Sequence, residues 1–187
     1  MIRVVNCRSS GINALLRVLV LLLFVSGIGR AQTPEEVEAR LKSAFLLNFA
    51  RYVEWPPSAF AGSNNVVVIG IVGQDPLKQH LDDTVQGKTV ERRPVEVKRS
   101  KNISELLGCH VLFVPASERE RLRMILTRLQ DRPVLTVSDM DGFKDAGGMI
   151  QLKKKSGMMR FDINRSAAEK AHLKISSKLL KLADNPQ

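Results

Sequence analysis

Histidines and neighbouring carboxylates are the side chains most able to do chemistry in this chain. The three histidines, His80, His110 and His172, lie too far apart in sequence for the short spacing of a zinc site. Asp139 and Asp141 could hold a cation, but two carboxylates without further ligands are equally typical of an ordinary loop. The sequence contains no Gly-x-Ser-x-Gly elbow for a nucleophile. It therefore indicates no catalytic residue and no metal site.

A glycine pair, Gly70 and Gly73, lies between an apolar run and a predicted helix, as in a dinucleotide-binding turn. The full G-x-G-x-x-G pattern is missing, and Asp75 would place a negative charge where a pyrophosphate should sit. A tight turn followed by a helix cap explains the segment better, so no cofactor is expected.

Aromatic residues gather in one short stretch of a chain in which Phe, Trp and Tyr make up only 5%. The stretch contains the only tyrosine and the only tryptophan, together with Phe60 at its end. Core packing is the ordinary role of such residues. A groove for an aromatic ligand or a partner segment is the alternative. The candidate binding residues are Phe45, Phe49, Tyr52 and Trp55.

These residues belong to a helix that is predicted to begin at Thr33-Pro34 and to end before Pro56-Pro57. Its apolar residues follow helical spacing on more than one face. One face has to pack on the core. The second face has to be covered either by helices near the C-terminus or by another molecule.

Three apolar runs rich in β-branched residues predict strands that are buried on both faces. They span residues 66–72, 109–114 and 134–137. Helical patterns between them predict a single α/β domain, with a mainly parallel sheet and helices on both faces. An antiparallel C-terminal hairpin is predicted around Ser156-Gly157.

Turn and cap signals place the remaining elements. Asp75 followed by Pro76 predicts a helix from there to about Val85. Ser117 with Glu120 has the capping-box spacing at the start of another helix. The last elements are predicted as hairpin strands at 149–152 and 159–163 and short helices at 165–171 and 176–183.

The beginning of the chain has the pattern of an export signal, with a basic start and an almost wholly apolar run at 14–28. Gly29-Arg30-Ala31 supplies small residues where a signal peptidase reads them. The run is short for a membrane span, although an uncleaved anchor is the alternative. We therefore expect a signal peptide at 1–31, cleavage near Ala31, and one exported domain at 32–187.

Loss of this segment changes the charge of the chain. The formal net charge of +10 falls to +6, because residues 32–187 hold 25 basic and 19 acidic side chains. An exported, mildly basic protein with mixed charges does not normally meet chromosomal DNA, so nucleic acid is not an expected partner.

Cys109 is the only cysteine of the expected mature chain, so no internal disulfide can form. It opens an apolar run, which favours a buried small side chain. An intermolecular bridge or a reactive thiol is the alternative.

Residues 41–56, LKSAFLLNFARYVEWP, resemble the opening signature of the YfiR family, a group of periplasmic proteins of Gram-negative bacteria. Further segments resemble the family in the same order and extend over nearly the whole expected mature chain. These segments are residues 87–90, 93–95, 109–114, 133–137, 147–150, 160–164 and 173–183.

The resemblance implies a periplasmic regulator and names no catalytic residues. In the best-known system, such a protein represses an inner-membrane diguanylate cyclase by acting on its periplasmic part. An outer-membrane lipoprotein sequesters the repressor, which releases cyclic-di-GMP synthesis and favours biofilm. The implied partners are thus the periplasmic part of an inner-membrane signalling protein and an outer-membrane lipoprotein, and pairing of two copies stays open. That system's protein carries paired cysteines, whereas this chain keeps Cys109 alone.

Three classes of function follow from the sequence. A regulator that acts by protein–protein contact is the leading interpretation, and a periplasmic sensor that binds a small ligand is the alternative. A periplasmic enzyme on an α/β scaffold is the third, and the missing nucleophile–base set argues against it.

We predict that the exported chain begins at Gln32, because Ala31 ends the small-residue cleavage pattern. N-terminal sequencing of protein from fractionated envelopes measures this directly. An intact Met1 form in the membrane pellet would contradict the prediction.

Overall fold

A seven-stranded sheet forms the centre of the computed structural model, which describes residues 32–61 and 65–185. The expected signal peptide at 1–31 lies outside these residues. The strand order is β3-β4-β2-β5-β6-β7-β8, and a separate small sheet pairs β1 with β9. The strands are β1 Val53–Glu54, β2 Val67–Val72, β3 Thr89–Val90, β4 Arg93–Ser100, β5 Val111–Val114, β6 Leu135–Ser138, β7 Ile150–Lys155, β8 Met158–Ile163 and β9 Lys174–Ile175.

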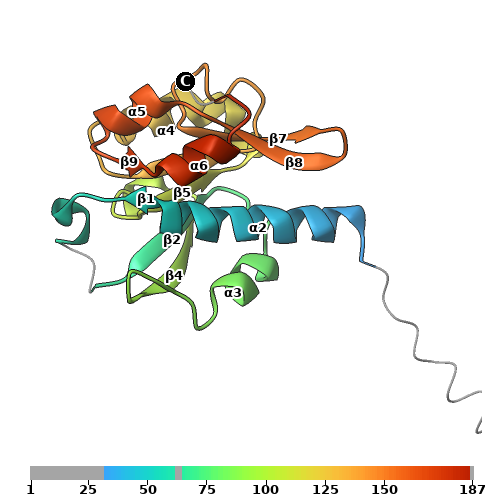
Figure 1. Cartoon of the computed structure of the whole chain (residues 1–187), viewed down its shortest axis with the longest axis horizontal. Helices are drawn as coiled ribbons and strands as arrows, with labels where there is room; N and C mark the ends of the chain where they lie inside the picture. The colour runs from blue at the N-terminus through green and yellow to red at the C-terminus, as the bar shows by residue number, and fades with distance from the viewer. Residues whose placement is uncertain (1–31, 62–64, 186–187) are drawn as a thin grey trace, which may run out of the picture. The chain divides into compact units, whose positions relative to one another are not determined.

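One long helix, α2, crosses the domain, and shorter helices lie around it (Figure 1). Short 3₁₀ turns link several strands to the next element. The α-helices are α2 Pro34–Tyr52, α3 Gln79–Val85, α4 Leu122–Arg128, α5 Arg165–Lys170 and α6 Ser177–Leu182. The 3₁₀ turns are η1 Pro57–Phe60, η2 Ile103–Glu105 and η3 Ala116–Arg121.

The sheet is doubly wound about its central strand. β2 pairs in parallel with β4 on one side and with β5 on the other, and β5–β6 and β6–β7 are also parallel. Strand–helix–strand crossovers are right-handed, so crossovers that run toward opposite edges of the sheet place their helices on opposite faces of it. The residues of α3 and α4 accordingly belong to different core clusters. The winding reverses between β2 and β5, where such sheets commonly bind ligands.

Side chains of β2 point alternately to the two faces of the sheet and so contribute to both core clusters. Ile69 and Ile71 point to the larger core cluster, which α2, α3, α5 and α6 cover. Val72 points to the smaller one, which α4 and η2 cover. All three side chains are fully buried, which explains why this strand is a continuous apolar run.

Both edges of the sheet are antiparallel. β3 pairs with β4 at one edge, and β7 pairs with β8 at the other. Ser156 and Gly157 join β7 to β8 with positive φ at both positions, as the favoured two-residue hairpin turn requires. The predicted α/β class is confirmed, whereas the mainly parallel description holds only in part, because the sheet is mixed.

The C-terminal residues return to the sheet after α6. The amide of Asp184 donates to the carbonyl of Phe161 at 3.0 Å, and the amide of Ile163 donates to the carbonyl of Asn185 at 3.3 Å. Residues 184–185 therefore lie along the outer edge of β8.

The small sheet fixes the end of α2. Val53 pairs with Ile175 and Glu54 with Lys174, and the amide of Ser176 donates to the carbonyl of Tyr52 at 2.9 Å. The end of the first helix is thus tied to the chain that leads into α6.

The helix that was predicted to begin at Asp75 begins at Gln79. The Asp75 carboxylate accepts a 2.7 Å hydrogen bond from the amide of Leu77, which closes a local turn instead of capping a helix. Lys78 then has a φ of 49°, outside the helical range, so regular helix starts only after it.

The capping box at Ser117 and Glu120 does not form. η3 begins after Pro115 without a side-chain cap, and α4 starts at Leu122. Glu118 packs inward there instead and is buried. The sequence pattern correctly predicted a helical segment here, but its prediction of a side-chain cap on the first turn was wrong.

Cys109 is buried, as the sequence favours, and it forms no disulfide within the described residues. Its thiol packs where Gly70 leaves room, because a Cβ at position 70 would lie 3.1 Å from the sulfur. Burial raises the pKa of this thiol to about 12.

We predict that Cys109 of the folded chain resists thiol reagents at neutral pH, because it is buried and stays protonated. Labelling under non-reducing conditions should be slow in the native protein and complete in guanidinium. Rapid native labelling, or a covalent dimer on a non-reducing gel, would contradict the prediction.

Candidate functional site

The candidate aromatic residues of α2 divide between the core and the surface. Phe49 is fully buried, and its ring meets that of Phe161 edge-on at 5.2 Å. Phe45 is half-buried and contacts both rings, at 5.6 Å from Phe49 and 5.7 Å from Phe161. Phe49 therefore holds α2 on β8, and Phe45 forms the border of that contact with solvent.

Tyr52 lies on the outer face of the helix, where its exposed fraction is 38%. At 100° per residue, Val37, Leu41 and Phe45 fall on the same side of α2 as Tyr52. Val37 and Leu41 are exposed by 43% and 44%. We call these four residues the α2 stripe.

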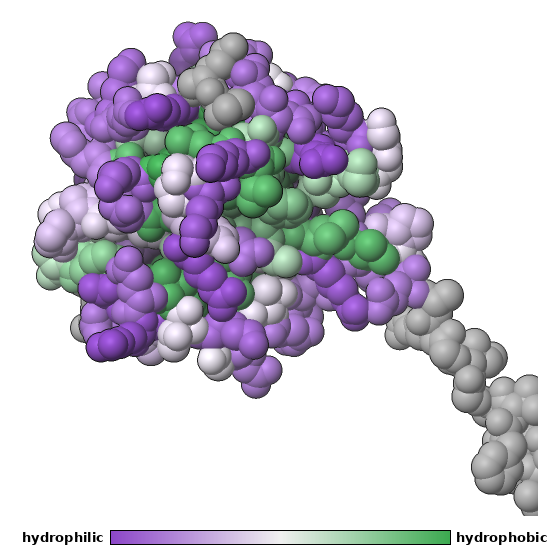
Figure 2. Space-filling model, viewed as in Figure 1, coloured by the Kyte–Doolittle hydropathy of each residue, from purple (hydrophilic) through white to green (hydrophobic). Residues whose placement is uncertain are grey.

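Phe45 of the α2 stripe is half-buried against Phe161, whereas Val37, Leu41 and Tyr52 are apolar surface that neither the sheet nor α6 covers. Figure 2 shows hydrophobic surface along the N-terminal half of α2, continuing toward α6 and the β7–β8 hairpin. The contacts of α6 with α2 bury Leu179, while Leu182 of the same helix remains exposed. The C-terminal helix therefore covers only part of the second apolar face that the sequence predicts.

Trp55 is separated from the other candidates. It lies beyond β1, and its ring meets the imidazole of His110 edge-on at 6.0 Å. Phe60 stacks on the same imidazole at 4.6 Å, and the Arg93 guanidinium lies 4.0 Å from the Phe60 ring centre. Trp55 thus fastens the η1 segment to the sheet, and the structure does not bring all four candidates together in one groove.

His110 is the buried polar centre of this cluster. The amide of Val68 donates to Nδ1 at 3.1 Å, so the neutral ring must carry its proton on Nε2. Nε2 is buried, and among residues 32–61 and 65–185 it has no hydrogen-bond partner of normal geometry. The pKa of His110 is lowered to about 4, mainly by burial and also by the positive charge of Arg93, and the backbone carbonyl of Ala59 opposes both effects.

A buried lysine on α2 is a site that the sequence analysis missed. Lys42 Nζ lies 2.7 Å from Glu38 and 2.5 Å from Asp139, and Lys154 of the hairpin pairs with the other oxygen of Glu38. Burial lowers the pKa of Lys42, but the hydrogen bonds to Asp139 and Glu38 outweigh burial and leave the pKa raised. The Glu38–Lys42 spacing of i,i+4 was the available signal in the sequence.

This chain of charges connects α2 to the end of β6 and to the β7–β8 hairpin. The hydrogen bonds from Lys154 and Lys42 hold the pKa of Glu38 below its usual value. Asp139 forms an ion pair with Lys42, and among the described residues its second oxygen is buried without a hydrogen-bond partner. Within residues 32–61 and 65–185, no group of three or more potential ligands is placed to hold a metal ion.

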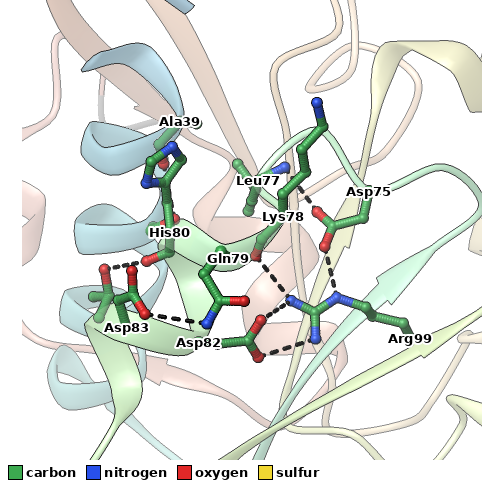
Figure 3. Close-up of polar contacts among 11 residues, drawn as sticks. Ala39, Asp75, Leu77, Lys78, Gln79, His80, Asp82, Asp83 and Arg99 are labelled. Carbon is green, nitrogen blue, oxygen red and sulfur yellow. Dashed lines mark hydrogen bonds and ion pairs between the residues drawn. The ribbon is translucent and has the colours of Figure 1, made fainter. Parts of the chain in front are cut away.

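A second set of charges lies around Arg99, at the carboxyl end of β4 (Figure 3). The Arg99 guanidinium donates to Asp75 at 2.6 Å and to Asp82 at 2.7 Å, and it also reaches the carbonyl of Lys78 at 3.0 Å. Burial lowers the pKa of Arg99, but its bonds to Asp82 and Asp75 outweigh that effect and raise it. Arg99 therefore stabilises the turn that delays α3.

The crevice where the sheet reverses its winding is filled by a side chain. A Cβ on Gly73, at the end of β2, would collide with the Glu118 carboxylate. That carboxylate is held by Arg121 at 2.8 Å. The place where doubly wound sheets commonly bind ligands is thus occupied here by the protein itself.

The fold is an α/β domain whose helix α2 leaves apolar side chains open to solvent. The family model described as YfiR/HmsC-like matches residues 39–184, and the chain belongs to this family. The family is regulatory rather than catalytic and works in the periplasm. No curated protein was found to match the chain. In the part of the chain that the structure describes, none of the helices has the length and apolarity of a bilayer span.

We predict that His110 makes the folded chain less stable in mild acid. Its pKa is lowered on folding, so between about pH 6.5 and about pH 4 the unfolded state binds more protons and stability falls as pH falls. From about pH 7 to about pH 5 this effect should remove about 2 kcal/mol of the free energy of unfolding. Urea unfolding at both pH values measures it.

The variant His110→Asn, whose amide oxygen can replace Nδ1 as the acceptor for Val68, should lose most of this pH dependence. The matched control is His172→Asn at an exposed position, which should keep it. Equal pH dependence in the wild type and in His110→Asn would show that His110 is not responsible.

Proposed function

We propose that this chain is a periplasmic regulator that controls a membrane signalling protein, such as a diguanylate cyclase, by direct contact. The observation that carries the proposal is the α2 stripe, an apolar face of the longest helix in the described part of the chain, which remains open to solvent. Membership of a regulatory family supports it.

The stripe has the character of an interface because solvent-exposed apolar side chains follow one another over successive turns. Val37, Leu41 and Phe45 are spaced by four residues, so their side chains form a continuous ridge. A partner that buries such a ridge gains apolar contact without having to unpack the core. Contiguous apolar patches of this kind usually mark protein–protein contacts.

The ridge is also held rigidly, which lowers the entropic cost of binding. Leu46 and Ala50 fix the opposite face of α2 in the core, and the Lys42–Asp139 ion pair fixes its rotation. The partner that we propose for this face is the periplasmic part of an inner-membrane signalling protein. An outer-membrane lipoprotein that competes for the same face would release that protein from control.

A second candidate function, sensing of a small ligand, is favoured by one specific cavity. A space of about 490 Å³ lies between α4, α5 and the loop before β7, lined by Leu129, Thr136, Met149, Asn164 and Ala167 among others. Its volume is within the range of small-molecule sites. A ligand that raises the melting temperature of the chain, but not of Ala167→Phe with its filled cavity, would support this function.

We predict that Leu41→Ser and Tyr52→Ala weaken partner binding about tenfold each, as loss of interface anchors does, with little change in melting temperature. Affinity is measured with the periplasmic part of a membrane cyclase recovered by pull-down of envelope proteins with the mature chain. The matched control Met124→Ser removes a similarly exposed apolar side chain from α4 and should bind normally.

The variant Phe49→Ala distinguishes the effect of a core residue from that of an interface residue. It should cost about 3–5 kcal/mol of the free energy of unfolding, because Phe49 is fully buried. Its folded fraction should bind the partner with normal affinity. Normal partner affinity and normal repression of cyclic-di-GMP synthesis in both Leu41→Ser and Tyr52→Ala would remove the α2 stripe from the site.

A further inference from the structure

The positive charge of the domain is concentrated in its last quarter. Residues 32–149 hold sixteen basic and sixteen acidic side chains, so this larger part is neutral. Residues 150–187 hold nine basic and three acidic side chains, a surplus of six. The whole net charge of the expected mature chain therefore comes from the β7–β8 hairpin, α5, β9 and α6.

These cations lie beside the most exposed large apolar side chains of the described residues, Leu182 at 63% and Met158 at 53%. Leu182 follows Lys181 on α6, one turn after Lys178. Met158 is directly opposite Lys155 in the hairpin.

The hairpin and α6 form one continuous surface. Asp184, two residues beyond Leu182, accepts from Lys155 Nζ at 3.4 Å, and it lies equally close to Lys153. Burial raises the pKa of Asp184, but the bonds to Lys155 and Lys153 outweigh it and leave the pKa lowered. The C-terminal residues thus bring Leu182 to the hairpin that carries Met158.

We propose that this surface, the basic end of the domain, binds an anionic membrane. It consists of Lys155 and Met158 of the hairpin with Lys178, Lys181 and Leu182 of α6. Lysines near a negatively charged bilayer are attracted to the headgroups, and apolar side chains between them enter the boundary with the acyl chains. Flexible lysine stems can lie along this apolar surface while their ammonium groups stay in water.

A lipid surface fits the basic end better than an acidic protein does. Met158 and Leu182 are single side chains that stand out from two different elements, each accompanied by lysine. The α2 stripe, in contrast, is a continuous apolar ridge along one helix, which is the form that a protein partner packs against. Membrane binding at the basic end leaves Tyr52, at the other end of α2, available for protein contact.

The inference goes beyond the proposed function, because it needs no protein partner. Its test is sedimentation of the chain, purified from the periplasm, with vesicles of equal parts phosphatidylglycerol and phosphatidylcholine. Binding is expected at low salt, should weaken as salt is added, and should be absent from vesicles of phosphatidylcholine alone.

Replacement of lysines tests the charges. Lys178→Gln with Lys181→Gln should lower the vesicle partition coefficient about thirtyfold, since each lysine near an anionic surface contributes a factor of about five. The matched control, Lys88→Gln with Lys101→Gln, removes the same charge from exposed positions in the neutral part and should bind as the wild type does.

Replacement of the apolar tips tests insertion. Leu182→Ser with Met158→Ser should weaken vesicle binding with little change in melting temperature, whereas Met124→Ser on α4 should not weaken it. Failure to bind the anionic vesicles, equal binding to phosphatidylcholine, or equal loss in the Lys88 and Lys101 control would overturn the proposal. If replacement of the two α6 lysines leaves vesicle binding unchanged but abolishes partner binding, those lysines belong to a protein contact instead.

Discussion

The packing of α2 on the sheet is the contact on which the rest of the domain depends. Phe49 places its ring against Phe161 with no exposure to solvent, and this joins the first element of the domain to one of the last. The side of α2 that carries Leu41 and Tyr52 takes no part in this packing and remains exposed to solvent. The surface that we assign to partner binding is thus a direct result of how the core is filled.

Elements with strong local patterns were predictable from the sequence. The β-branched run around Ile69 identified β2, and Ser156-Gly157 identified the turn between β7 and β8, because such signals lie within a few residues of the structure they specify. The strand order was not predictable to the same degree. Single-strand patterns do not say which strand is the neighbour, and the antiparallel pairing of β3 with β4 depends on contacts that form only in the folded chain.

The candidate site was predicted only in part, for related physical reasons. Helical spacing placed Phe45, Phe49 and Tyr52 on one helix, but it could not show that Phe49 faces the core. Trp55 was grouped with them because it is close to them in the sequence. Its neighbour in space is His110, although β2 lies between these two residues in the sequence. Lys42 went unnoticed because its partner Asp139 is 97 residues away, and no local pattern reports an ion pair of that kind.

The short tail that follows α6 has a consequence for how the protein behaves in concentrated solution. β8 is the last strand of the sheet, and an unprotected last strand offers free amide and carbonyl groups to the next molecule. Asp184 and Asn185 occupy two of those groups from within the same chain. These few residues cover part of the edge of β8 and so hinder edge-to-edge association with the sheet of another molecule. An affinity tag or a truncation after α6 should therefore lower solubility before it disturbs the fold.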